Sequence, residues 1–394
     1  MAPKDIGALT GADESLNHQI VDTFATVAES DLAWTEKIWG SLASTDGSLQ
    51  VDFGLGKYRN RGVIDGFAGV SRGREQWTVR GSRELRSAPD ETTVGPIEYE
   101  VLDSLKQVRF RLAPNDVQPI SFDLVLTGVT PPFFEDRNLV RNRNSGRLDI
   151  NVVRYHQGGH VRGSVTVDGE TVEIDDDSWF GFRDHSWGIR QSVGVQPSDL
   201  IQNTAAQPGA TAGHAADRSG MKWTPAFLRR PDGSYYEMAV FVAQGAWGYA
   251  SAYVNEASGA QTRIRDAEVH ISYDPRTRFV RGGELHLVTE AGDRRVIEVE
   301  ALGESGFFLK TGGYGSWGSH IHGSWMGPLH LEGDYIDDCW FGKHARELGQ
   351  LRDTPIRVRE GDAVGYGIME SIVHGVWPEL GLTAETDYRA SYSA

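Results

Sequence analysis

Short runs of alternating apolar and polar residues recur along the chain, and turn-forming residues separate them. The run Leu-Gln-Val-Asp-Phe at 49–53 alternates with period two behind the turn signal Ser-Thr-Asp-Gly-Ser at 44–48, which predicts a β-hairpin. Only residues 20–28 place apolar side chains at helical spacing, so one short helix is expected there. The pattern predicts an all-β protein of antiparallel strands, as sandwich or barrel, with fewer than about a fifth of its residues in helices.

Asp-Gly pairs mark the expected turns. They stand at 65–66, 168–169 and 232–233, each between runs rich in β-branched or aromatic residues. In the hairpin around 168–169, valines and an isoleucine alternate with polar residues, so it should have one apolar face. Further strands are expected at 235–243, 249–254, 268–273, 285–289, 295–301 and 363–370.

The chain has 394 residues, more than one hydrophobic core usually serves, so two domains are expected. Residues 191–220 are rich in Gln, Ser, Ala, Gly and Asn, contain two prolines and lack periodicity, which predicts a domain boundary or a lid. We therefore divide the chain into domains 1–200 and 201–394.

Composition narrows the classes of partner. A formal charge of −16 would repel nucleic acid and anionic membrane surfaces. The single cysteine, Cys339, allows no internal disulfide and is expected to be a small buried apolar residue. The N-terminus lacks a signal-like pattern, and no run approaches the ~18 apolar residues of a membrane span. These features predict a cytoplasmic protein. The 47 Gly and the many aromatic residues suit tight turns and aromatic-lined cavities.

One segment concentrates ionisable and aromatic side chains. Residues 178–190 read Ser-Trp-Phe-Gly-Phe-Arg-Asp-His-Ser-Trp-Gly-Ile-Arg and should form a strand that runs into a glycine bend. On a regular strand, Arg183, His185 and Trp187 share one face, and Asp184 lies on the other with Ser186. Asp184 can join His185 only if a bend or bulge redirects it.

The run Arg-Asp-His-Ser-Trp-Gly, preceded by Tyr-His-Gln-Gly-Gly-His-Val-Arg-Gly at 155–163, resembles the AttH-like, carotenoid 1,2-hydratase (hydroxyneurosporene synthase) family. The resemblance implies two lipocalin-like β-barrels and a largely apolar substrate handled without a cofactor. It places His185 and Trp187 on the His and Trp that carotenoid hydratases use near the substrate. The family's further Tyr and Asp are expected on the next strand, where Tyr236 and Glu237 form the nearest pattern.

Addition of water to an alkene needs an acid that protonates carbon, a π face that stabilises the cation, and a base that guides water. Trp187 would supply the π face and His185 the base. The acid would be a carboxyl whose pKa burial raises, with Asp184, Glu237 and Glu370 as the contenders. The alternative is that Asp184, His185 and Arg190 form a buried polar network that only holds strands together.

Aromatic and histidine side chains near these motifs are expected to line the substrate cavity. They are Tyr155, Trp179, Tyr236, Trp317, His320, His322 and Trp325.

His320 and His322 also raise the question of a metal, because a His-x-His pair places two imidazoles on one strand face. The cupin pattern has Gly six residues before the first His and Glu about four after the second, whereas this chain has Tyr314 and Met326 there. The Gly-rich run 312–315 lacks the context of a phosphate loop and is expected to be a turn. We therefore expect neither a metal nor an organic cofactor.

Two functions remain open. The first is a cofactor-independent lyase or isomerase, of hydratase or dehydratase type, acting on an apolar terpenoid, steroid or aromatic molecule between the two domains. The second is a lipocalin-like binding protein that shelters such a molecule without converting it. The pair of His185 and Trp187 favours the enzyme, and a homodimer is left open.

Overall fold

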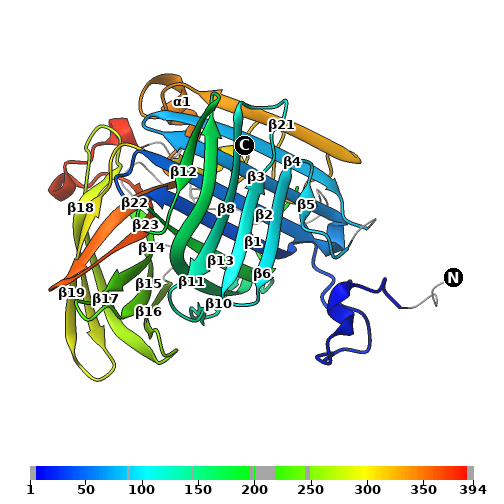
Figure 1. The fold of residues 1–394 in the computed structure, drawn as a ribbon, viewed down its shortest axis with the longest axis horizontal. Helices are drawn as coiled ribbons and strands as arrows, with labels where there is room; N and C mark the ends of the chain where they lie inside the picture. The colour runs from blue at the N-terminus through cyan, green and yellow to red at the C-terminus, as the bar shows by residue number, and fades with distance from the viewer. Residues whose placement is uncertain are drawn as a thin grey trace.

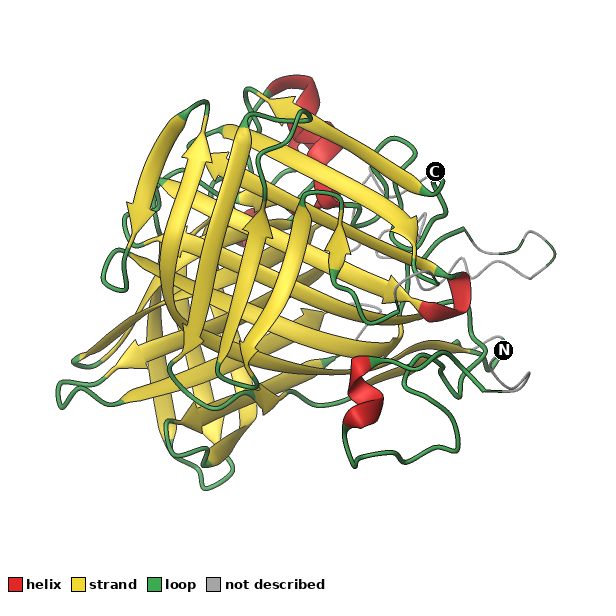
Figure 2. Cartoon of the chain, turned by 45° about the vertical axis from the view of Figure 1, so that its right-hand side comes forward, coloured by secondary structure: helices red, strands yellow, loops and turns green. Residues whose placement is uncertain are grey.

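The computed structural model describes residues 6–86, 89–142, 145–195, 197, 199, 218–244 and 249–387. Strands hold 57% of the residues and helices 7%, which confirms the all-β prediction. The strands form two barrel-like antiparallel sheets that lie against each other (Figures 1 and 2). None of the helices in the described part of the chain has the length and apolar character that a membrane crossing requires.

The first sheet is built mostly from the first half of the chain. Its strands follow the spatial order β21-β4-β3-β2-β1-β13-β11-β8-β7-β6-β5, and β9, β10 and β12 also pair with β11. The bounds are β1 Trp34–Ser44, β2 Leu49–Tyr58, β3 Val63–Arg72, β4 Glu75–Glu84, β5 Thr93–Val94, β6 Ile97–Asp103, β7 Gln107–Leu112, β8 Ile120–Gly128, β9 Phe133–Phe134, β10 Asn138–Arg141, β11 Leu148–Val167, β12 Glu170–Ile174, β13 Trp179–Ile189 and β21 Leu329–Ile336.

The second sheet follows the order β19-β18-β17-β16-β15-β14-β23-β22-β20. Because β19 also pairs with β22, its long strands close into a barrel. The bounds are β14 Ser219–Arg229, β15 Tyr235–Gln244, β16 Ala250–Glu256, β17 Gln261–Tyr273, β18 Val280–Thr289, β19 Arg294–Ala301, β20 Phe307–Phe308, β22 Arg352–Glu360 and β23 Ala363–His374. The described residues contain one α-helix, α1 Gly342–Leu348, and 3-10 turns at Gly11–Glu14, Arg59–Arg61, Leu309–Gly312, Pro378–Leu380 and Ala384–Thr386.

The second half of the chain returns to the first sheet. After β20 the segment 309–328 crosses from the second sheet, and β21 then pairs along its full length with residues 76–83 of β4 (Figure 1). The alternation of the sequence did not reveal this crossing. Most of the boundary or lid expected at 191–220 lies outside the described residues.

The two faces of the first sheet bury different chemistry. One face packs the barrel's own core, in which residues such as Ile38, Leu42 and Phe53 are shielded from solvent. The opposite face carries polar and aromatic residues, yet it is also buried, because the second barrel and the segment 309–328 cover it. Polar positions on these strands are therefore interface positions rather than solvent positions.

The turn predictions are confirmed at two of three Asp-Gly pairs. Asp168 and Gly169 both adopt positive φ, +51° and +82°, as a type I′ hairpin turn requires. The pair at 232–233 joins β14 to β15. The prediction at 65–66 is wrong, because Asp65 and Gly66 lie within β3. Within this strand a neighbouring backbone lies close to Gly66, which favours a residue without a side chain.

The helix expected at 20–28 does not form, and the segment consists of bends and turns. Asp13 and Asp22 accept hydrogen bonds from the backbone N–H groups of Phe24 and Thr23, which competes with helical pairing. Val21 is fully exposed, so no packing surface stabilises a helix there. His320 and His322 were expected on a strand, but both lie in a loop.

Candidate functional site

Successive residues of strand β13 point alternately to two different environments. Asp184 is paired with Trp39 of β1 and His156 of β11, and it faces the second barrel. His185 is paired with Ile38 and Tyr155 and faces the opposite side, at the end of the first barrel. The strand is regular here, so the parity expected from the sequence separates Asp184 from His185 and Trp187.

An ion-pair network surrounds Asp184. The guanidinium of Arg154 lies 3.0 Å from both Asp184 and Glu135, and Glu135 lies 3.1 Å from Nε2 of His156. Burial opposes ionisation of Glu135, but Arg154 and His156 hold its pKa below the ordinary value. Arg154 also lies over the indole ring of Trp223, 5.6 Å from the ring centre. The network joins the two barrels, because Trp223 belongs to β14.

A group of carboxyls lies next to this network. Asp353 of β22 and Glu370 of β23 are direct cross-strand neighbours. Asp353 faces Asp52 of β2 in the other sheet, and the two buried carboxyls are close enough to shift each other's pKa. Trp39 Nε1 donates to Asp353 Oδ2 at 2.9 Å. We call the side chains of Asp52, Asp353 and Glu370 the carboxyls of the interface.

These carboxyls resist ionisation. Burial, reinforced by the charge of Asp353, raises the pKa of Glu370 to about 8. Burial and mutual repulsion raise the pKa of Asp353 well above its ordinary value, and burial also raises that of Asp52. Two carboxyls in contact cannot both ionise cheaply, so this pair holds a proton near neutral pH.

Aromatic rings form the apolar part of the interface. Trp39 and Trp223 meet edge to face with ring centres 4.9 Å apart, and Trp223 is the cross-strand neighbour of Glu370. Phe180 and Phe182 of β13 stack with Tyr366 and Phe227 of the second barrel. The interface thus combines protonated carboxyls with π faces.

His185 belongs to a separate group at the end of the first barrel. Its Nε2 lies 3.1 Å from Glu36 Oε1, and its Nδ1 lies 3.1 Å from the hydroxyl of Tyr155. The hydrogen bond with His185 lowers the pKa of Glu36. Trp187 packs against His185, and Phe134, which is 51% exposed, packs against Trp187. We call Glu36, Phe134, Tyr155, His185 and Trp187 together the His185 relay. The side chain of His185 is 24% exposed.

The remaining predicted residues are dispersed. Glu237 is buried at the contact between the barrels, where Thr130 donates to it at 2.7 Å and burial raises its pKa to about 7. Trp179 and Tyr236 lie in the cores of the first and second barrels. Trp317 Nε1 donates to Asp334, and Trp325 is 55% exposed.

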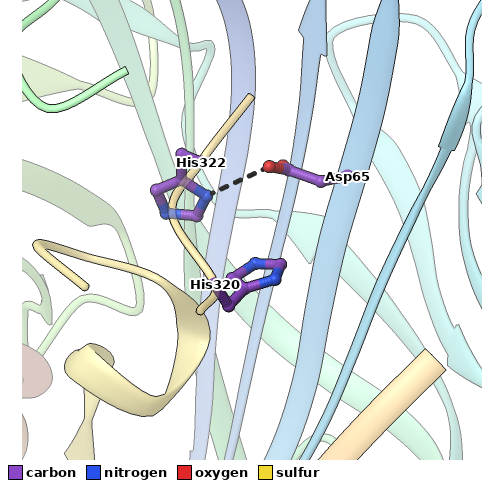
Figure 3. A group of neighbouring side chains, drawn as sticks. All are labelled: Asp65, His320 and His322. Atoms are coloured by element: carbon purple, nitrogen blue, oxygen red, sulfur yellow. Dashed lines mark ion pairs between the residues drawn. The ribbon is translucent and has the colours of Figure 1, made fainter. Parts of the chain in front are cut away.

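His320 and His322 are buried beside Asp65 on the same covered face of the first sheet (Figure 3). Nδ1 of His322 lies 3.6 Å from Asp65 Oδ2, and Nε2 lies 2.8 Å from Nζ of Lys37. Lys37 also packs on the ring of Tyr314, 3.7 Å from its centre. Burial, aided by the charge of Arg190, lowers the pKa of Lys37.

Residues 9–383 match the model of a protein family that is described as a family of unknown function (DUF8625). The chain belongs to this family. No curated protein matches it. Among solved structures, it is similar to an AttH protein from Nitrosomonas europaea at 14% identity and TM-score 0.47, covering 88% of this chain and 94% of that one. It is also similar to kievitone hydratase from Nectria haematococca at 11% identity and TM-score 0.38, covering 94% and 97%.

Several residues of the interface between the barrels were not identified from the sequence. Asp52 and Trp39 fell within the predicted hairpin, where a polar position usually means a solvent-facing side chain. Asp353 and Arg154 carried no local signal, because their partners come from strands distant in the sequence. Of the interface residues, Asp184, Glu237 and Glu370 were named from the sequence as candidate acids.

Proposed function

We propose that this protein is a cofactor-independent lyase or isomerase, of hydratase or dehydratase type, which acts on an apolar terpenoid, steroid or aromatic molecule at the face between its two barrels. The observation that carries the proposal is Glu370, a carboxyl with a pKa of about 8 beside the indole of Trp223. A carboxylic acid that keeps its proton at neutral pH can protonate carbon, and an indole stabilises the positive charge that results. The resemblance of residues 183–188 to the AttH-like, carotenoid 1,2-hydratase family also supports it.

The groups of the interface supply the steps of a hydration. Glu370 transfers its proton to one alkene carbon, and the π electrons of the double bond form the new C–H bond. The cation left on the other carbon lies against Trp223 and Trp39, an interaction worth about 2 kcal/mol when desolvated. Water adds to the cation, and Asp184, held by Arg154, accepts the proton that the water loses. Dehydration follows the same steps in reverse.

The His185 relay is the rival location for the same chemistry. The family resemblance assigns the substrate to His185 and Trp187, and the hydrogen bonds to Glu36 and Tyr155 would orient the imidazole as a base. Glu370 and His185 cannot serve one site, because the first sheet separates them: Glu370, in β23 of the second sheet, lies by the covered face that carries Trp39, whereas His185 is on the opposite face. The two locations are therefore separable by mutation.

Binding without conversion is the second candidate function. The exposed ring of Phe134, packed against Trp187 and Tyr155, favours it, because an open aromatic surface can hold an apolar ligand without any acid or base.

The test is turnover of a panel of apolar alkenes and the matching tertiary alcohols, with terpenoid, steroid and aromatic members, in deuterated water with mass-spectrometric detection. Wild-type protein should place one carbon-bound deuterium in each hydrated product. Glu370→Gln should lower turnover roughly 10²–10⁴-fold. His185→Ala and the exposed control Glu298→Gln should retain turnover.

The opposite pattern, loss in His185→Ala and retention in Glu370→Gln, would move the site to the His185 relay. Tight binding of panel members with no deuterium incorporation would replace the enzyme with a binding protein.

A further inference from the structure

Three potential ligand side chains converge beneath the segment that carries the chain back to the first sheet. Asp65 projects from β3, and His320 and His322 come from the crossing segment 309–328 (Figure 3). One ligand atom from each lies within 4.8 Å of the others. Their exposed fractions are 1%, 2% and 6%, so water solvates them poorly.

The imidazoles lack the partners that buried polar groups normally have. Among the residues that the structure describes, neither nitrogen of His320 has a hydrogen-bond partner, and Nδ1 of His322 has none within bonding distance. The contact from this Nδ1 to Asp65 Oδ2 is 3.6 Å, and that from His320 Nδ1 to Glu332 is 3.9 Å, both too long. An unsatisfied buried polar group costs about 1–3 kcal/mol, so three such nitrogens in one place require an explanation.

Contrary to the expectation from the sequence that the chain binds no metal, we propose that Asp65, His320 and His322 bind a divalent first-row transition metal ion, separate from the reaction proposed above. Two imidazole nitrogens with one carboxylate oxygen form a donor set that suits Zn²⁺ and Fe²⁺ better than Mg²⁺ or Ca²⁺, which prefer oxygen. Three protein ligands leave a fourth position for water or for Glu332, whose carboxylate lies next to His320.

The surroundings orient the ligands as outer partners do in metal sites. Asp65 accepts from the hydroxyl of Tyr58 at 3.1 Å through Oδ1 and from the backbone N–H of Gly323 at 2.7 Å through Oδ2. On the far edge of the His322 ring, Nε2 lies 2.8 Å from Nζ of the buried Lys37. When Nδ1 binds the metal, Nε2 keeps its hydrogen and donates it to Lys37 as an uncharged amine, so the lone pair of Nδ1 is directed at Asp65. The carboxylate and the ring are thus fixed facing each other.

The imidazoles also fit closely around the backbone. A side chain on Gly313 would meet His320 Cδ2 at 2.7 Å and His322 Cε1 at 3.3 Å, so glycine leaves the room that both rings occupy. Tetrahedral Zn²⁺ sets its ligand atoms about 3.3 Å apart, given Zn–N bonds of about 2.0–2.1 Å. Binding therefore draws any two of the ligand atoms together by at most about 1.5 Å, from the 4.8 Å within which they lie.

Two basic side chains lie near the imidazoles. Arg80 is paired with Glu332 and Asp334 and donates to the carbonyl of Thr311. Lys37 contacts the ring of His322 on the side away from Asp65. Asp65 therefore faces His322 directly, whereas Oε1 of Glu332 lies between Arg80 and His320.

A second cluster of Glu268, His270 and His286 provides a matched comparison. It lies on the surface of the second barrel, and each histidine already contacts a glutamate, at 3.1 Å and 2.6 Å. Metal that binds there would be weak surface binding. Removing this cluster controls for such binding.

The experiment titrates the metal-free full-length chain, without an affinity tag, with Zn²⁺ in a calorimeter and with Co²⁺ in a spectrophotometer. Wild-type protein should bind one equivalent, and Co²⁺ should give the visible absorption of a four-coordinate site. Asp65→Asn and His320→Gln should weaken binding by more than the about 10–100-fold typical of an outer partner, whereas Tyr58→Phe should fall within that range. The double variant His270→Ala/His286→Ala should bind as wild type does.

Circular dichroism establishes that each variant is folded, and Zn²⁺ should raise the Tm of wild type but not of Asp65→Asn. Absence of stoichiometric binding by wild type, or binding lost only with His270 and His286, would overturn the proposal. The readout is binding alone, so its failure leaves the proposed function, which rests on Glu370, untouched.

Discussion

The protonated carboxyls of the interface should make the stability of this protein fall as pH rises through neutrality. Glu370 has a folded pKa of about 8, against an ordinary value of 4.5. Between these values the native state holds a proton that the unfolded state releases, so each rise in pH favours unfolding. Below pH 4.5 both states are protonated and the effect vanishes; above pH 8 both are ionised and no further loss occurs.

The useful window is pH 6.5 to 8. Below it, His322, whose pKa burial lowers to about 4, changes stability in the opposite direction. Within the window, a pKa of 8 predicts that Glu370 alone removes about 1.6 kcal/mol from the free energy of unfolding. Asp353, whose pKa is also raised, adds to the fall.

Glu370→Gln isolates the contribution of one group, since glutamine imitates the protonated acid. Urea unfolding followed by tryptophan fluorescence, at several pH values from 6.5 to 8, gives the slope for each variant. The variant should lose about 1.6 kcal/mol less than wild type across the window, and Glu298→Gln, an exposed position, should follow wild type. Equal slopes for wild type and Glu370→Gln would show that Glu370 is ionised in the folded protein and would refute the reasoning.

Other variants test the remaining contacts. Arg154→Met should lower the free energy of unfolding by about 3–5 kcal/mol, because it leaves Asp184 and Glu135 buried without their counter-charge; a loss below 1 kcal/mol in urea unfolding would contradict this. Trp39→Phe keeps an aromatic ring, although a smaller one, and removes the donor to Asp353, so it should lower the free energy of unfolding by at least about 1–3 kcal/mol, measured the same way at pH 7. His185→Ala should leave Tm nearly unchanged, because its side chain is partly exposed and its relay lies outside both cores; a large fall in a thermal scan would assign it a structural role instead.

The sequence predicted the fold class and the face of β13 on which each residue lies. It did not predict that the second barrel covers one of these faces. Period-two alternation predicts strands because side chains alternate across a sheet, and this held for the hairpin of β1 and β2. Alternation does not tell a polar side chain in water from one under another barrel, so Asp52 looked like a surface residue. Glu370 was named as a contender for the acid, but its raised pKa depends on Asp353 and the closed interface, which only the tertiary structure brings together.

The return of β21 to the edge of β4 also affects how the molecule forms during synthesis. The first sheet cannot be completed until residue 336 has left the ribosome, after most of the second barrel has been made. Until then β4 exposes unpaired backbone groups, which are a template for wrong pairing with other chains. We therefore expect residues 1–200 expressed alone to aggregate more readily than the whole chain, because the edge of β4 that β21 covers would stay open.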